Sequence, residues 1–251
     1  MAMTAAVMSP WRSVSELRLC ARMYVWAYAL DDFTERDTTD LASLDEMLGR
    51  CRTIVHTGAC DTSDPLLGAL SGLHKELTRQ PLYPALSALW TEKFDEGMRG
   101  LRYDWLAGHG RKGSAPPDNG VAEYLDHTES ILVWITHLPR WMSHQDPGLL
   151  DRLDALIPAL EDFSVTIRLA NDLSTYAWEK DQQGQNNILM YGVSADWVQE
   201  QLDARIASGK RHLAPLLSEH FPPAVELIRC VEWSVTFYAL ADFRKPQEPH
   251  A

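Results

Sequence analysis

The sequence lacks dense runs of basic residues, and it lacks any apolar run long enough to cross a membrane. Its 251 residues include 23 lysines and arginines against 35 aspartates and glutamates, which gives a net charge of −12. Binding to nucleic acid relies on basic patches that neutralise phosphates, so we expect no nucleic-acid partner. A membrane-spanning helix needs about 18 or more consecutive apolar residues, so we expect no membrane span. If the substrate is also anionic, cations must mediate its binding.

Cysteine is scarce as well. The chain has four cysteines, and none of them forms a Cys-x-x-Cys pair. This usage indicates reduced thiols in a cytosol. The mildly apolar N-terminus soon reaches Arg12, Glu16 and Arg18, which does not fit the apolar core of a secretory signal. We therefore expect a cytoplasmic protein.

Alternating polar and apolar residues, the mark of a half-buried strand, are also rare. Apolar residues instead recur at three- and four-residue spacing, which predicts amphipathic helices. The run from Gly108 to Gly120 is rich in glycine and proline and predicts a loop. Pro158 lies inside a predicted helix, where a proline breaks or kinks the helix. We expect an all-α, single-domain helical bundle over residues 1–251. Its predicted helices cover residues 13–34, 39–56, 65–78, 82–107, 120–138, 147–180, 194–208 and 221–243.

An acidic run, D-D-F-T-E-R-D, follows an aromatic segment at residues 31–37. On a helix, Tyr24, Tyr28, Asp31 and Glu35 share one face, with Asp32 further round. Crowded carboxylates repel each other unless water or a cation screens them. Mg²⁺ takes carboxylate oxygens and keeps phosphates and waters as its other ligands. The run is therefore either a metal-binding segment or a solvated acidic helix end.

A second polar run, N-D-L-S-T-Y-A-W-E, occupies residues 171–179. Asn171, Thr175 and Glu179 are four residues apart and form one polar stripe along a helix. Their amide, hydroxyl and carboxylate oxygens are hard ligands that suit Mg²⁺ better than zinc. Arg168 lies one turn earlier on the same face, and its fork of donors matches a phosphate. The alternative is a helix exposed on this side, with Arg168, Asp172 and Glu179 as ordinary surface charge.

Together the two runs resemble the metal-binding motifs of class I terpene synthases. The first resembles the family's aspartate-rich motif, and the second resembles its Asn-Asp-x-x-Ser/Thr-x-x-x-Glu triad. Their order, their separation and the helical pattern also agree, and the resemblance covers nearly the whole chain. It implies that Arg168 binds diphosphate. The implied metal ligands are Asp31, Asp32, Glu35, Asn171, Thr175 and Glu179.

Several family features are missing. Members usually carry more helix before the first motif, so the domain is short at its N-terminus. The diphosphate-sensing arginine of the family would fall near Leu125, where His127 is the nearest substitute. The C-terminal Arg-Tyr pair is absent as well. Tyr238 sits about where that pair would fall, and Arg244 could replace its arginine. Lys180 follows Glu179 instead of preceding it.

The resemblance implies that a cluster of Mg²⁺ ions, normally three, binds the diphosphate of a prenyl substrate. It also implies a closed apolar cavity in which aromatic faces stabilise carbocations. The candidates for this lining are Tyr24, Tyr28, Trp134, Trp178 and Tyr238, each of which could equally be a core residue. The sequence of the second run, followed by G-Q-N-N, resembles the corresponding sequence in bacterial diterpene synthases that act after a class II cyclase.

We therefore expect an Mg²⁺-dependent lyase that ionises a copalyl-type diphosphate or geranylgeranyl diphosphate. The product would be a cyclic hydrocarbon or alcohol. Three alternatives remain: a sesquiterpene synthase acting on farnesyl diphosphate, a prenyl-chain-elongating synthase, and a non-catalytic helical binding protein. A prenyl diphosphate is the expected partner, and a homodimer is a candidate assembly.

Overall fold

The computed structural model describes residues 2–38, 40–60, 63–110, 120–127, 131–182 and 184–240. Within these ranges the chain is helical and contains no β-strand, so the predicted all-α class is confirmed. No helix in them is long and apolar enough to cross a membrane. Arg244 lies outside the described residues, as do the middle of the predicted 108–120 loop and the C-terminal end. The four cysteines are free.

The helices follow the predicted segments closely. In chain order they are α1 (Ala2–Met8), α2 (Val14–Asp32), α3 (Leu41–Thr57), α4 (Pro65–Leu77), α5 (Tyr83–Gly110), α6 (Gly120–His127), α7 (Ile131–His144), α8 (Leu153–Glu179), α9 (Ala195–Ser218) and α10 (Pro222–Leu240). A π-helical turn, Phe33–Asp37, continues α2, and short 3-10 turns cover Leu150–Arg152 and Ile188–Tyr191.

Local sequence signals set several helix ends. Ser13 and Glu16 form a reciprocal capping box at the start of α2, in which each side chain bonds the other residue's backbone N–H. Asp64 caps α4 directly before Pro65, a residue favoured in the first helical turn. At the end of α3, Gly58 adopts φ +70°, a left-handed conformation that costs glycine little.

Several predicted helix boundaries need correction. The segment predicted at 194–208 is too short, because α9 runs on through Pro215 to Ser218. The segment predicted from residue 147 becomes α-helical only at Leu153, after the 3-10 turn Leu150–Arg152. The segment predicted at 120–138 consists of α6 and α7, and α7 runs on through Pro139 to His144. Pro158 does not break α8, because it lies in the second turn, close to the helix start. Helix α1 was not predicted; it packs on α2 and α10.

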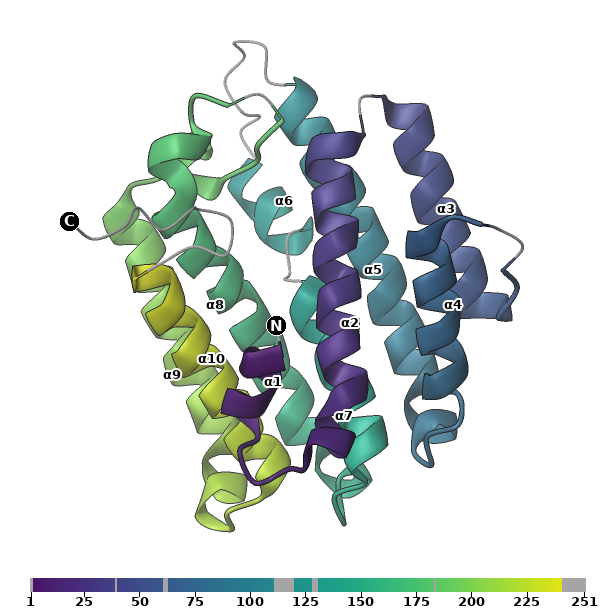
Figure 1. Ribbon diagram of the computed structural model, residues 1–251. Helices are drawn as coiled ribbons and strands as arrows, with labels where there is room; N and C mark the ends of the chain where they lie inside the picture. The colour runs from purple at the N-terminus through teal and green to yellow at the C-terminus, as the bar shows by residue number, and fades with distance from the viewer. Residues whose placement is uncertain are drawn as a thin grey trace, which may run out of the picture.

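The bundle places the two polar runs at the same end. Helices α2 and α8 both run upward in Figure 1, so Asp31 at the end of α2 and Glu179 at the end of α8 lie toward the top. Helix α7 packs on α2 and α5, whereas α8 packs on α9 and α10. The fold therefore places motifs that are 140 residues apart in sequence at the same end of the bundle.

Aromatic residues fill much of the core between these helices. Trp26 stacks on Phe94 with ring centroids 5.9 Å apart, and Trp90 packs on the same ring at a tilt, with centroids 5.5 Å apart. Trp90 and Trp141 are almost completely buried. These three tryptophans therefore belong to the packed core.

Candidate metal and diphosphate site

Most of the polar stripe of α8 is buried, and Asn171 at its start is half-buried. Thr175 is 1% exposed and Glu179 is 6% exposed, and Asp172 beside them is 1% exposed. The Thr175 hydroxyl donates to the backbone oxygen of Asn171, at 2.9 Å, which directs its lone pairs away from the helix backbone. The alternative in which these residues are ordinary surface charge is therefore wrong, because surface charge does not bury in an apolar helix face.

Asn187, in the segment that follows α8, packs onto this stripe. Its amide nitrogen donates to Glu179 Oε2 at 2.9 Å and to the backbone oxygen of Asp172 at 2.9 Å. The same nitrogen lies 3.5 Å from Thr175 Oγ1. Asn187 is fully buried, so two of the predicted metal ligands share one buried amide donor.

Arg168 sits at the centre of an ion network. Its guanidinium donates to Tyr124 Oη at 2.7 Å, to Asp172 Oδ1 at 3.1 Å and to Asp104 Oδ2 at 3.0 Å. It also donates to the backbone oxygen of Asn186 at 2.6 Å. These contacts fix the guanidinium on protein groups from α5, α6 and α8. Its assignment as a diphosphate ligand stays a prediction.

Burial shifts the pKa values of the ionisable groups in this network. Loss of water raises the pKa of the Asp172 carboxyl to about 7, although Arg168 beside it and the hydroxyl donated by Tyr124 lower it. Desolvation lowers the pKa of Arg168, but the nearby carboxylates and Tyr124 outweigh it and raise that pKa well above its usual value. We conclude that the arginine is always charged, whereas the ionisation of Asp172 changes near neutral pH.

The acidic run at 31–37 adopts a conformation that helical spacing did not predict. The backbone N–H of Thr38 donates to the oxygen of Phe33, five residues earlier, at 3.0 Å. The hydroxyls of Thr34 and Thr38 donate to the backbone oxygens of Asp31 and Phe33, each at 2.9 Å. π-Helical turns occur often at functional sites. Since such a turn rotates side chains differently from an α-helix, Glu35 does not simply continue the predicted face.

The three predicted acidic ligands differ in exposure. Asp31 and Glu35 are half-buried, whereas Asp32 is exposed. Among the described residues, no three His, Cys, Asp or Glu side chains gather as a metal-binding cluster. The assignment of Asp31, Asp32 and Glu35 as one metal-ligand set therefore stays a prediction.

Oxygen ligands suitable for Mg²⁺ are nevertheless present on both helices. The stripe offers one carboxylate with an amide and a hydroxyl, and the acidic run offers carboxylates at the same end of the bundle. Hard oxygens of this kind, with substrate phosphate completing the shell, suit Mg²⁺. The residues present fit the metal in their chemistry.

Two of the predicted aromatic residues lie together near the acidic run. Tyr28 is hydrogen-bonded to Tyr238 of α10 and lies near Asp31. Burial, together with these neighbours, raises the pKa of Tyr28 well above its ordinary value. Tyr238 also packs on the apolar cluster around Val165 and Leu169 of α8. It therefore connects the surroundings of both polar runs.

Tyr24 lies deeper on α2, where its hydroxyl points to Met8 Sδ at 3.5 Å. Trp178 is half-buried, and its indole Nε1 is buried without a partner among the described residues. Lys180 is exposed just beyond the end of α8. Their predicted roles in substrate binding remain predictions.

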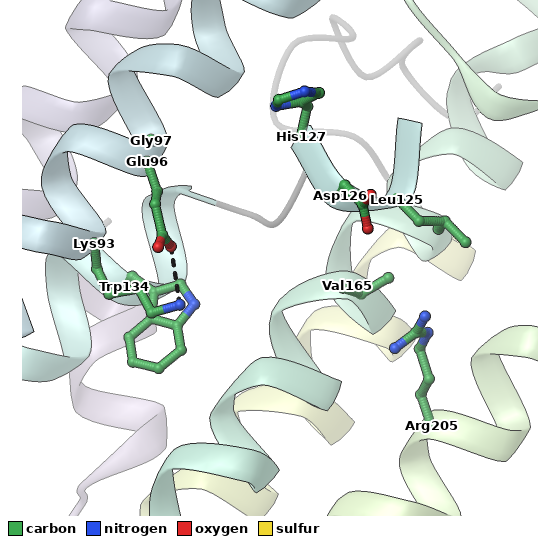
Figure 2. Close-up of a pocket in the computed structure, with 9 residues that line it drawn as sticks. All are labelled: Lys93, Glu96, Gly97, Leu125, Asp126, His127, Trp134, Val165 and Arg205. Carbon is green, nitrogen blue, oxygen red and sulfur yellow. Dashed lines mark ion pairs between the residues drawn. The ribbon is translucent and has the colours of Figure 1, made fainter. Parts of the chain in front are cut away.

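Trp134 lines a pocket among five helices. A pocket of about 410 Å³ opens between α5, α6, α7, α8 and α9, and Figure 2 shows its lining side chains. The ammonium of Lys93 lies 4.6 Å from the centroid of the Trp134 ring. His127 lines this pocket too and stacks on Tyr103, with centroids 4.8 Å apart. The lining thus contains Trp134 and also His127, the nearest substitute for the family's diphosphate-sensing arginine.

Comparison with known proteins identifies the family. The chain is 47% identical over 246 residues to the ent-pimara-9(11),15-diene synthase of Streptomyces sp. (strain KO-3988), and the match covers 97% of this chain and 83% of that protein. The chain belongs to the class I terpene synthase family. As a member of that family, it is a lyase acting on prenyl diphosphates. No protein-family profile matches the chain.

Solved structures agree on the fold of this terpene synthase. It resembles the linalool/nerolidol synthase of Streptomyces clavuligerus in complex with 2-fluorogeranyl diphosphate, with a TM-score of 0.69 and 16% identity. That match covers 92% of this chain and 84% of the other chain. A second structure of the same synthase gives a TM-score of 0.68 at 17% identity, and it covers 93% of this chain and 86% of the other.

Sequence reasoning did not assign roles to four residues of the site: Asp104, Tyr124, Asn186 and Asn187. Asp104 and Tyr124 reach Arg168 from α5 and α6, and no spacing rule connects them to it. The G-Q-N-N run at 184–187 carried a signal, since adjacent asparagines after a helix often bond its exposed groups. The structure places both asparagines against the stripe and its arginine.

Proposed function

We propose that this terpene synthase uses Mg²⁺, normally three ions, to ionise a twenty-carbon prenyl diphosphate and convert it to a cyclic hydrocarbon or alcohol. The substrate is either a copalyl-type diphosphate or geranylgeranyl diphosphate. The observation that carries the substrate class is the 47% identity, over nearly the whole chain, to a diterpene synthase. The buried oxygen stripe of α8 supports the metal site.

In this proposal Asn171, Thr175 and Glu179 hold one metal ion, and Asp31, with Asp32 and Glu35, holds the others. Bound there, the ions would neutralise charge on the diphosphate, the chemistry that favours its departure with the electron pair of the allylic C–O bond. Arg168, fixed at one turn from Asn171, keeps positive charge beside the diphosphate and orients the stripe. Lys180 adds positive charge just beyond the end of α8, and Arg244 is proposed, from the family resemblance alone, to replace the missing arginine.

The aromatic residues stabilise the carbocation that remains. Tyr28, which is hydrogen-bonded to Tyr238, lies near Asp31, and this supports placing both aromatic residues beside the metal end of the substrate cavity. A ring face stabilises a cation by roughly 0.5–2 kcal/mol, and Tyr24 and Trp178 add further faces. Water must stay out until the cascade ends by proton loss or water capture.

The experiment is an assay of diphosphate release with product analysis. Geranylgeranyl diphosphate, a copalyl-type diphosphate and farnesyl diphosphate are supplied in parallel, with Mg²⁺ or with excess chelator. We expect release and a cyclic product from one of the twenty-carbon substrates, and none with chelator. Turnover of farnesyl diphosphate alone would make the protein a sesquiterpene synthase. A requirement for a second, five-carbon substrate would reveal a chain-elongating synthase.

Two variants test the metal site. Asp31→Ala and Asn171→Ala should each abolish diphosphate release while leaving the helical circular dichroism spectrum intact. Glu46→Ala is the matched control. The Glu46 side chain is 72% exposed on α3, and it forms an ion pair with Arg50 one turn along the same helix. Activity like that of the wild type in either site variant, at saturating Mg²⁺, would refute the assignment.

A further inference from the structure

Asn187 has a fixed orientation. Its side-chain oxygen accepts the backbone N–H of Leu189 at 3.0 Å and so caps the 3-10 turn Ile188–Tyr191. An amide whose oxygen accepts a backbone N–H must present its NH₂ group on the other side. That side is α8, where the NH₂ group meets Glu179 Oε2.

The contacts of this amide match what a metal ligand needs from its surroundings. The NH₂ group donates to Oε2 of Glu179 and so holds this carboxylate in one orientation. Its bond to the backbone oxygen of Asp172 ties the amide to the helix that carries all three predicted ligands. Hydrogen-bonding partners behind metal ligands commonly orient the ligands and raise metal affinity.

We propose that Asn187 is the positioning residue of this metal site: its buried amide orients Glu179, and with it Thr175, for Mg²⁺. The inference rests on the proposed function, because it assigns a role toward the metal held by the stripe. Asn187 touches neither metal nor substrate in this role. It acts through Glu179, because its bond to Oε2 restricts the rotamers of a long side chain.

The test measures Mg²⁺ binding without turnover. Thermal melting of the full chain is followed at a fixed concentration of inorganic diphosphate while Mg²⁺ is varied. Asn187→Ser keeps an oxygen to cap the turn and removes the NH₂ group that faces α8. We expect it to need about 10–100 times more Mg²⁺ for half of the maximal rise in melting temperature. Asn187→Thr keeps the cap with more side-chain volume and provides a second variant if the serine variant melts too early.

Ser194→Ala is the control for a general loss of stability. Its hydroxyl caps α9 at Trp197 N, at 3.1 Å, and contacts no residue of the stripe. It should melt earlier but keep the Mg²⁺ requirement of the wild type. Saturating Mg²⁺ should also restore turnover in Asn187→Ser, which a merely structural defect would not allow.

The outcomes separate the two proposals. If both Asn187 variants keep the Mg²⁺ requirement of the wild type, Asn187 does not position the ligands and the inference is wrong. If the wild-type protein shows no Mg²⁺-dependent rise in melting temperature with diphosphate, the metal site itself fails, and the inference fails with it.

Discussion

Replacing Tyr124 with phenylalanine removes a single oxygen from the buried network around Arg168. The tyrosine is fully buried, and its hydroxyl donates to Asp172 and accepts from Arg168 Nε at 2.7 Å. The ring, whose packing against Tyr191 has a centroid distance of 5.3 Å, remains in the variant. Tyr124→Phe therefore isolates the polar contribution of the hydroxyl.

The size of the effect follows from the partners that remain. A hydrogen bond to a charged group contributes about 1.5–3 kcal/mol, so losing two could cost twice that. The loss is smaller here, because Arg168 Nε keeps Asp172 Oδ1 at 3.1 Å and Asp172 Oδ2 keeps the N–H of Ile188 at 3.3 Å. We expect the free energy of unfolding to fall by about 2–3 kcal/mol.

The assay is urea unfolding followed by circular dichroism at pH 8, where Asp172, with its pKa of about 7, is mostly ionised. Tyr83→Phe is the control, since Tyr83 is half-buried at the start of α5 and its pKa is raised by burial alone. It should change stability by less than about 0.5 kcal/mol. If Tyr124→Phe changes it as little, the network does not stabilise the fold through this hydroxyl.

Three further perturbations probe the packing and the buried charges. Gly209→Ala places a Cβ 2.3 Å from the Phe163 ring, whereas the control Gly68→Ala has nothing within 4 Å of its new Cβ. In urea unfolding, Gly209→Ala should lower the free energy of unfolding by about 1–3 kcal/mol relative to Gly68→Ala. Equal effects would contradict the close contact between α8 and α9. Burial lowers the pKa of His137 from 6.5 to about 4. As the pH drops from 6.5 to 4, His137 is therefore protonated in the unfolded chain before it is protonated in the folded protein. The free energy of unfolding should fall by about 3 kcal/mol over this range. His137→Leu should remove that loss, and unfolding curves across this pH range check it. Glu226→Gln should cost about 3–5 kcal/mol, because the fully buried carboxylate balances buried cations; an unchanged melting temperature would contradict this.

Sequence predicted the candidate site in part. The i, i+4 spacing of Asn171, Thr175 and Glu179 fixes a common helix face, and the structure keeps it. The acidic run lies at the end of α2, but helical spacing did not predict its π-helical turn, in which the Thr34 and Thr38 hydroxyls bond to backbone oxygens. Trp134 lines the pocket between α5, α6, α7, α8 and α9, and its role as a cavity aromatic stays a prediction, because aromatic type and spacing do not tell which cavity a buried ring faces.

By itself, the sequence determined the helical class, most helix ends and the family resemblance. These depend on apolar periodicity, caps and short motifs, which act over a few residues. Tertiary packing decided the rest. It buried the stripe of α8, engaged Arg168 with Asp104 and Tyr124, and placed Asn187 behind Glu179. Those contacts join helices and loops that meet only after the helices have packed around the core. No local sequence pattern therefore encodes them.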